Sequence, residues 1–321
     1  MIRRRIYQYA PEHYEKYKRA MIGVLAAKGR PVDHDSPFGL SSEVWVEDHP
    51  WPYVIAPSGD EARAAAVAIR HKPKLQKAVL DFSCEETVQE ELVLAIVQHP
   101  DLIHLEFQHH CMFSDEYFQR LGTEVQGLQS LVIQQRFIAS PYCSYDACDI
   151  GVSWMIKNSH DTLQKLTIKN GRTERTLKAI RTCTNLKELT VVRSDIELID
   201  LRFVPVETLT LDMCEPISWE TFFEYQISPS LRQLYLQNMH YSHKLNELFH
   251  ALCGAVHKLE HFHMGFVDDN FWTIVGPAIQ SSPTLTSFGI TRHGGSVGLR
   301  EFHGFDRAEL HDCILYTRIR T

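Results

Sequence analysis

The segment DTLQKLTIKN at 161–170 is followed by TNLKELTVVR at 184–193 and VPVETLTLDM at 204–213. Each has apolar residues at the first, fourth and sixth positions of one frame, as Leu163, Leu166 and Ile168 show in the first segment. A helix does not repeat with this spacing, whereas the alternation at the end of the frame is typical of a strand with one buried face. The pattern therefore predicts a series of short strands whose alternate residues face a shared core.

The same frame occurs nine times along the chain. The first residues of the nine copies are Leu75, Leu102, Leu128, Leu163, Leu186, Val206, Leu231, Leu259 and Leu285. Successive copies lie 27, 26, 35, 23, 20, 25, 28 and 26 residues apart. Helical stretches such as LNELFHALCGAVHK at 245–258 separate most of them. This period predicts strand-and-helix units that bury their apolar faces only by stacking.

These frames and helical stretches resemble the leucine-rich-repeat family, in its ribonuclease-inhibitor-like and cysteine-containing, F-box-associated subclasses. The resemblance implies an α/β solenoid, or horseshoe, with a parallel concave sheet and helices on the convex side. The chain departs from the family in one respect: the Asn or Cys expected three residues after the sixth position occurs only once, as Cys214. The Leu-Pro-x-Glu opening of an F-box is absent from the N-terminal region.

The pattern divides the chain into three parts. Residues 1–57 are expected to form an N-terminal helix and capping region, in which the helix either covers the core or docks another protein. Residues 58–292 are expected to form the solenoid, and residues 293–321 a C-terminal cap with a last strand or helix. The long spacing marks an insertion at about 135–149 without helical or alternating periodicity, which is interpreted as a surface loop or a contact element.

Composition and motifs exclude several classes of function. With 33 Lys and Arg against 40 Asp and Glu, the net charge of -7 argues against a general nucleic-acid binder. No apolar run approaches the length of a membrane span, and no secretory signal is recognised. We therefore expect a cytoplasmic protein; the alternative is a mitochondrial one, because Arg3, Arg4 and Arg5 open the chain without an early acid.

The sequence contains no recognised catalytic motif. GxSxG, P-loop and HExxH patterns are all absent. His261 and His263 share a predicted strand face, but no third metal ligand is identifiable near them. The eight cysteines form no CxxC pair and are interpreted as reduced thiols. We expect neither an enzyme, nor a bound metal, nor a cofactor.

The residues at the third, fifth and seventh positions of each frame are expected to point outward onto the concave sheet. Tyr235 is the best single candidate for a residue that anchors a protein partner, because tyrosine is enriched among interface hot spots. The residues predicted to bind a protein partner are Glu106, Gln134, Lys165, Lys169, Thr190, Asp212, Gln233, Tyr235, Gln237, His261 and His263. The alternative interpretation is that they are ordinary solvated strand residues.

Two functions are compatible with this pattern. The first is a non-enzymatic protein–protein interaction module that acts as an adaptor or substrate-recognition subunit through the concave sheet. The second is a structural subunit of a larger assembly, for example a mitochondrial one, held by its N-terminal arm and convex face. The oligomeric state is left open by the sequence.

Overall fold

The computed structural model describes residues 70, 75–81, 90–108, 115–134, 145–169, 174–194, 196–197, 199–239, 244–291, 302–309 and 313–319. The predicted N-terminal region, residues 1–57, lies outside the described residues, as do positions 135–144 of the predicted insertion.

One sheet runs through the described part of the chain and contains eleven strands. Its first nine strands follow one another in chain order and are parallel, and each coincides with one of the nine frames. Equivalent residues are paired across the strands, so that Leu166 lies beside Leu189, and Leu189 beside Leu209. The strands are β1 (Lys77–Asp81), β2 (His104–Gln108), β3 (Ser130–Gln134), β4 (Lys165–Lys169), β5 (Glu188–Val192), β6 (Thr208–Asp212), β7 (Gln233–Gln237), β8 (His261–Met264), β9 (Ser287–Thr291), β10 (Phe305–Glu309) and β11 (Cys313–Arg318).

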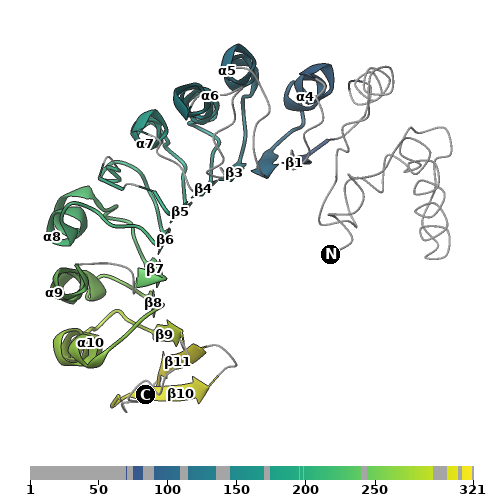
Figure 1. The fold of residues 1–321 in the computed structure, drawn as a ribbon. Coiled ribbons are helices and arrows are strands. Elements are labelled where there is room, and N and C mark those ends of the chain that lie inside the picture. The colour runs from purple at the N-terminus through teal and green to yellow at the C-terminus, as the bar shows by residue number, and fades with distance from the viewer. Residues whose placement is uncertain are drawn as a thin grey trace, which may run out of the picture.

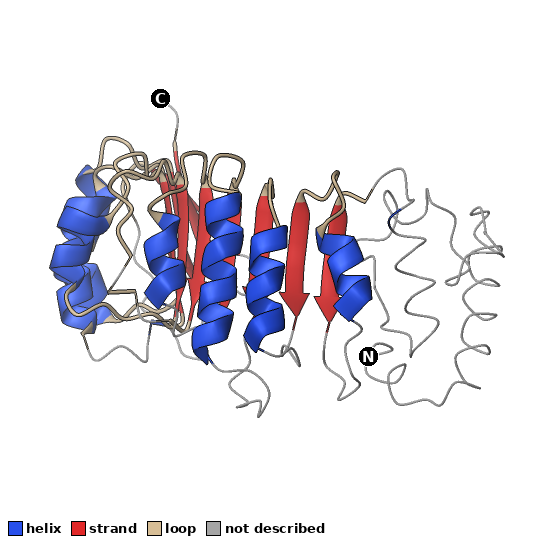
Figure 2. Cartoon of the chain, turned by 90° about the horizontal axis from the view of Figure 1, so that it is seen from above, coloured by secondary structure: helices blue, strands red, loops and turns tan. Residues whose placement is uncertain are grey.

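The described helices lie on one side of this sheet, and the whole stack curves with the strands on the inside of the arc (Figure 1). Figure 2 shows the helices packed side by side across one face of the strands. They are α4 (Glu90–Val97), α5 (Asp115–Glu124), α6 (Tyr145–Asn158), α7 (Glu174–Ile180), α8 (Trp219–Thr221), the π-helical turn η1 (Phe222–Gln226), α9 (Leu245–Val256), α10 (Asp269–Ile274) and α11 (Gly276–Ser281). The predicted α/β fold with a mostly parallel sheet is confirmed, and the arrangement is compatible with a solenoid.

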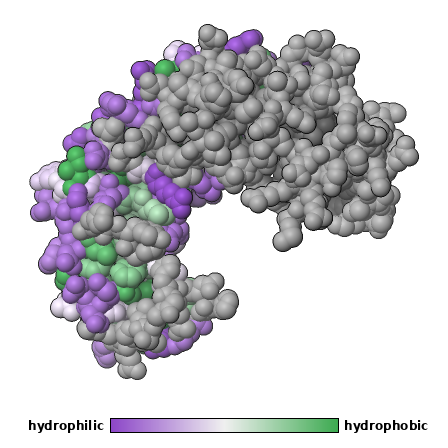
Figure 3. Space-filling view, viewed as in Figure 1, coloured by the Kyte–Doolittle hydropathy of each residue, from purple (hydrophilic) through white to green (hydrophobic). Residues whose placement is uncertain are grey.

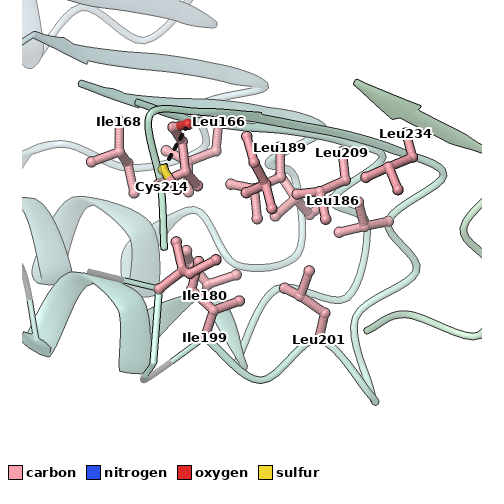
Figure 4. Packing of buried hydrophobic residues seen from close by; sticks show 14 of the residues in the cluster. Leu166, Ile168, Ile180, Leu186, Leu189, Ile199, Leu201, Leu209, Cys214 and Leu234 are labelled. Atoms are coloured by element: carbon pink, nitrogen blue, oxygen red, sulfur yellow. Dashed lines mark hydrogen bonds between the residues drawn. The ribbon is translucent and has the colours of Figure 1, made fainter. Parts of the chain in front are cut away.

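The core lies between the strands and the helices and continues from one repeat to the next. Figure 4 shows Leu166, Leu189, Leu209 and Leu234 aligned below the sheet, where they face residues of the outer layer. Leu189 and Leu209 are fully buried. Each such side chain contributes roughly 1.5–3 kcal/mol by leaving water. In the space-filling view the outer rim of the described part is mainly hydrophilic, and hydrophobic residues lie between this rim and the strands (Figure 3).

The connection from β5 to β6, which belongs to the shortest spacing, contains no helix among its described residues. Ile196, Ile199, Leu201 and Val204 are buried there. Figure 4 shows Ile199 and Leu201 on the outer side of the core, which a helix covers in most other repeats. Irregular backbone is stable at this position because it is tied to the next repeat: the Leu201 N–H donates to the Gln226 carbonyl at 2.7 Å.

The structure corrects the predicted insertion at 135–149, because its last five residues are the first part of α6. The Asp149 carboxylate is buried there and accepts hydrogen bonds from the backbone N–H groups of Arg175 and Thr176, each at 2.8 Å. These two groups lie at the start of α7, where helical N–H groups have no partner within the helix. One side chain of α6 therefore caps the beginning of the next helix.

The C-terminal residues extend the sheet in the opposite sense. β11 is antiparallel to β9 on one side and to β10 on the other. The expected last strand or helix is thus a strand, in which Ile314 and Tyr316 are buried. The Tyr316 ring stacks on Phe288 of β9, with ring centroids 4.3 Å apart. Through this contact the hydrophobic core continues from β9 to the antiparallel strands β11 and β10.

Candidate functional site

The side of the sheet that faces away from the helices is the candidate site. We call it the inner face, formed by the third, fifth and seventh positions of the frames in β2 to β9. Apart from Gly265 and Gly289, which are buried, the described residues there are half-buried or exposed, in alternation with the buried core residues of the same strands. All of the predicted partner-binding residues lie on this face: Glu106, Gln134, Lys165, Lys169, Thr190, Asp212, Gln233, Tyr235, Gln237, His261 and His263.

Strand pairing brings the fifth positions of five frames into one row. Thr167 lies beside Thr190, Thr190 beside Thr210, and the row continues through Tyr235 to His263. Adjacent strands are roughly 4.8 Å apart, so five strands present a row of roughly 20 Å. The row carries hydroxyl, phenol and imidazole groups and no carboxylate or ammonium group. It can form hydrogen bonds at each step without attracting a strongly charged ligand.

Charged side chains flank the row in pairs. The Lys165 ammonium lies 2.8 Å from the Glu188 carboxylate on the neighbouring strand, and both side chains are about half exposed. The Asp212 carboxylate accepts a hydrogen bond at 2.7 Å from the side-chain amide of Asn238. The exposed Lys165–Glu188 pair contributes little to stability, roughly 0–1 kcal/mol, and balances charge locally. The Asn238 amide is neutral, so its bond orients the Asp212 carboxylate without changing the local charge.

Tyr235 and His263 are neighbouring rings on the inner face, and each has a polar contact. Their ring centroids are 6.1 Å apart, with an interplanar angle of 30°. The Tyr235 hydroxyl lies 3.2 Å from the Gln233 side-chain oxygen, to which it donates, and His263 Nε2 is 2.8 Å from the Thr291 hydroxyl. Each ring is therefore held by a polar contact before any partner arrives, which lowers the entropy lost on binding.

Gly289 makes the position of the His263 ring possible. A Cβ atom at residue 289 would lie 2.6 Å from His263 Nδ1, too close for any side chain to be present while the ring stays in place. The neighbouring residue Ser287 supports the second histidine, since its hydroxyl is 2.7 Å from His261 Nδ1. Gly289, Thr291 and Ser287 were not among the predicted binding residues. Their positions follow from the frame, but their contacts with the histidines depend on side-chain orientation across two strands.

Burial lowers the pKa of His263 below its ordinary value. In the unfolded chain the imidazole is protonated as the pH falls through about 6.5, whereas the folded protein keeps the neutral ring to a lower pH. The wild-type protein is therefore expected to lose stability from about pH 7 downward until the folded-state pKa is reached. The variant His263→Gln lacks this titration. Chemical denaturation at about pH 7.5 and about pH 5.5 measures the free energy of unfolding of both proteins, and between these two pH values it should fall further for the wild type than for the variant. Equal decreases in the two proteins would contradict a lowered pKa of His263.

The described part of the molecule shows no metal centre, and two of its thiols, Cys183 and Cys214, are buried in the core. No group of three or more His, Cys, Asp or Glu side chains is placed there to hold a metal ion. Burial raises the pKa of Cys183 to about 12 and, as the main cause, that of Cys214 to about 11. These thiols stay protonated at neutral pH and are poor nucleophiles. The Cys214 thiol donates to the Val191 carbonyl at 3.3 Å, a contact within the core (Figure 4).

No family model and no curated protein matches the chain. Among the described helices, none has both the length and the apolar character needed to cross a bilayer. The case for a function therefore depends on the inner face and the fold that carries it.

Proposed function

We propose that the chain is a leucine-rich-repeat protein that binds a protein partner through its inner face, as a non-enzymatic adaptor or substrate-recognition subunit. The observation that carries the proposal is the continuity of this face: nine parallel strands pair in one register, and the described helices all lie on the other side. A concave surface of this kind is the usual binding surface of solenoid proteins.

The composition of the inner face favours a protein ligand. Its row of Thr, Tyr and His side chains can donate and accept hydrogen bonds along an extended segment or a convex surface. Tyr235 supplies the large, amphipathic ring that commonly dominates interface energetics. This ring lies beside His263 and its hydroxyl donates to Gln233, so the anchor of the proposed contact is held in place before binding.

The proposal is tested with the triple variant Tyr235→Ala, Gln237→Ala and His263→Ala. The wild type and the variant are expressed with an affinity tag, and their co-purified proteins are compared by mass spectrometry. We expect the variant to lose at least one specific partner, because truncating a hot-spot residue costs about 2 kcal/mol or more, a loss of about thirtyfold in affinity. Circular dichroism should show an unchanged fold, since all three side chains lie outside the core.

A matched control removes exposed rings from the outer layer. Phe203 is 83% exposed in the connection from β5 to β6, and Tyr225 is 55% exposed in η1. The double variant Phe203→Ser and Tyr225→Ser should keep the partner that the triple variant loses. A triple variant that retains every partner of the wild type would refute binding through the inner face.

The same exposed rings favour the second candidate, a structural subunit of a larger assembly. Ile217, which is 67% exposed, adds a third large apolar side chain outside the core. If this function is the correct one, the Phe203→Ser and Tyr225→Ser variant, or deletion of residues 1–30, releases the chain from its complex while the triple variant stays bound. Imaging of the tagged full-length chain separates the cytoplasmic from the mitochondrial alternative.

A further inference from the structure

β10 is the last strand of the sheet, and its outer edge pairs with no other described strand. In Figure 1 it lies at the end of the arc, outside β11. A strand edge presents backbone N–H and C=O groups that can pair with a further strand. A hollow of about 740 Å³ lies beside this strand and includes the rings of Phe302, Phe305 and Tyr316 in its lining. This end of the sheet therefore combines an edge that has no described neighbour with a hollow whose lining also includes Asp306, Arg307 and Glu309.

The hydrogen bonds of β11 show which β10 residues point toward the open edge. The Arg318 N–H donates to the Thr286 carbonyl, just before β9, at 2.8 Å, and the next N–H, of Ile319, donates to the Gly304 carbonyl, just before β10, at 2.9 Å. Along a strand, successive residues direct their backbone groups alternately to the neighbour on one side and to the neighbour on the other. Asp306 and Ala308 therefore direct their backbone groups toward β11, and the backbone groups of Arg307 point away from it.

The sequence of β10 is self-complementary in one antiparallel register. Two copies of an edge can pair only if outward-pointing residues lie opposite each other, which allows registers centred on any of the five residues of β10. The register centred on Phe305 overlaps the two strands at that residue alone. Three of the others place identical charges directly opposite: Asp306, Arg307 or Glu309 against the same residue of the second copy. The register centred on Ala308 instead pairs Arg307 with the partner's Glu309, and Glu309 with the partner's Arg307. Opposite charges across a strand pair stabilise it, and like charges destabilise it.

We propose that β10 is a dimerisation edge, at which two copies of this chain pair antiparallel about a two-fold axis through Ala308. The central Ala308 pair is the non-hydrogen-bonded type, in which Cα atoms approach to about 4.5 Å, so a small side chain suits it. Because paired strands keep their faces aligned, both inner faces point to the same side of the joined sheet. The short contact makes this a weak, concentration-dependent dimer rather than an obligate one.

Charges on an edge strand usually act to prevent pairing. Here like charges disfavour the registers centred on Asp306, Arg307 or Glu309, and opposite charges favour the register centred on Ala308. Arg307 and Glu309 already contact each other within the strand. Both side chains are partly exposed, so this contact contributes little and can be exchanged for the equivalent contacts between copies.

Sedimentation velocity over a concentration series tests the proposal with two charge-reversal variants of the full chain. Arg307→Glu places glutamate opposite glutamate, and Glu309→Arg places arginine opposite arginine. Each variant alone is expected to dimerise about tenfold or more weakly than the wild type. Mixing the two restores opposite charges at both pairs and is expected to recover dimers. Recovery cannot come from the contact within the strand, because both variants lack it.

Lys178→Glu is the matched control, since it reverses an exposed charge on α7 at a distance from β10. It should dimerise like the wild type. Circular dichroism confirms that each variant folds. A wild type that stays monomeric over the whole series, single variants that dimerise as well as the wild type, or a mixture that stays monomeric would each overturn the proposal. The partner-binding experiment on the inner face is read separately, because its variants leave β10 unchanged.

Discussion

Replacing Leu189 with aspartate is expected to abolish the cooperative folding of the described repeats. Leu189 is fully buried in β5, between Leu166 of β4 and Leu209 of β6. The change removes roughly 1.5–3 kcal/mol of apolar burial and adds several kcal/mol for an unpaired buried carboxylate. Native domains have a total stability of about 5–15 kcal/mol. Far-UV circular dichroism and urea denaturation should show lost helix and strand signal or a broad, non-cooperative transition.

The effect should spread beyond one repeat, because each repeat is stabilised mainly by its neighbours. Thr190→Asp is the matched control, since residue 190 is the next in β5 and is half-buried on the inner face. It should change the free energy of unfolding by no more than about 1 kcal/mol. Similar denaturation curves for Leu189→Asp and Thr190→Asp would contradict the assignment of alternate residues to core and inner face.

The strands could be predicted because their signal is local and repeated. The fourth and sixth positions of a frame, such as Leu189 and Val191, face the core as alternate residues of one strand. A single frame of this kind occurs by chance, but nine with similar spacing require a stacked structure. Stacking then fixes the register, because a slip by one residue would turn Leu189 toward solvent. For the same reason the inner-face positions of all predicted binding residues follow from the sequence.

The outer layer was less predictable, because it depends on contacts between repeats. The sequence assigns the first turn of α6 to an insertion, and Asp149 caps α7 at Arg175 and Thr176, 26 and 27 residues further along the chain. No local pattern indicates such a cap. At α10 the N-cap is Asp268, whose carboxylate accepts from the Phe271 N–H at 2.8 Å. Two adjacent aspartates offer the same chemistry, and only backbone geometry distinguishes them.

The candidate site shows the same limit. The sequence places Tyr235 and His263 on one face, but the support of His263 by Gly289 and Thr291 is a contact across strands. A glycine in a strand gives no sequence signal for a binding role. Gly289 matters here because the absence of a side chain leaves room for the His263 ring. The edge of β10 could not be predicted from the sequence either, because only its pairing with β11 shows which of its residues direct their backbone groups outward.

Gly122→Ala is expected to have the second-largest effect, by separating α5 from α6. A Cβ atom at residue 122 would lie 2.5 Å from the Gly151 carbonyl oxygen and 2.9 Å from its Cα atom. Both are backbone atoms of α6, so no side chain can rotate to make room. Overpacking of this kind costs about 1–3 kcal/mol, and the two helices must shift to relieve it. Alanine's better helix propensity, about 1 kcal/mol, offsets only part of this cost.

Gly254→Ala in α9 supplies the matched control, because no heavy atom lies within 4 Å of the position its Cβ would take. The same substitution should there raise the free energy of unfolding by up to about 1 kcal/mol, through helix propensity alone. Urea denaturation of the two variants measures the difference directly. Opposite signs are expected, because one glycine is a point of contact between helices and the other is not. A stabilised Gly122→Ala variant would show that α5 and α6 do not meet through their glycines.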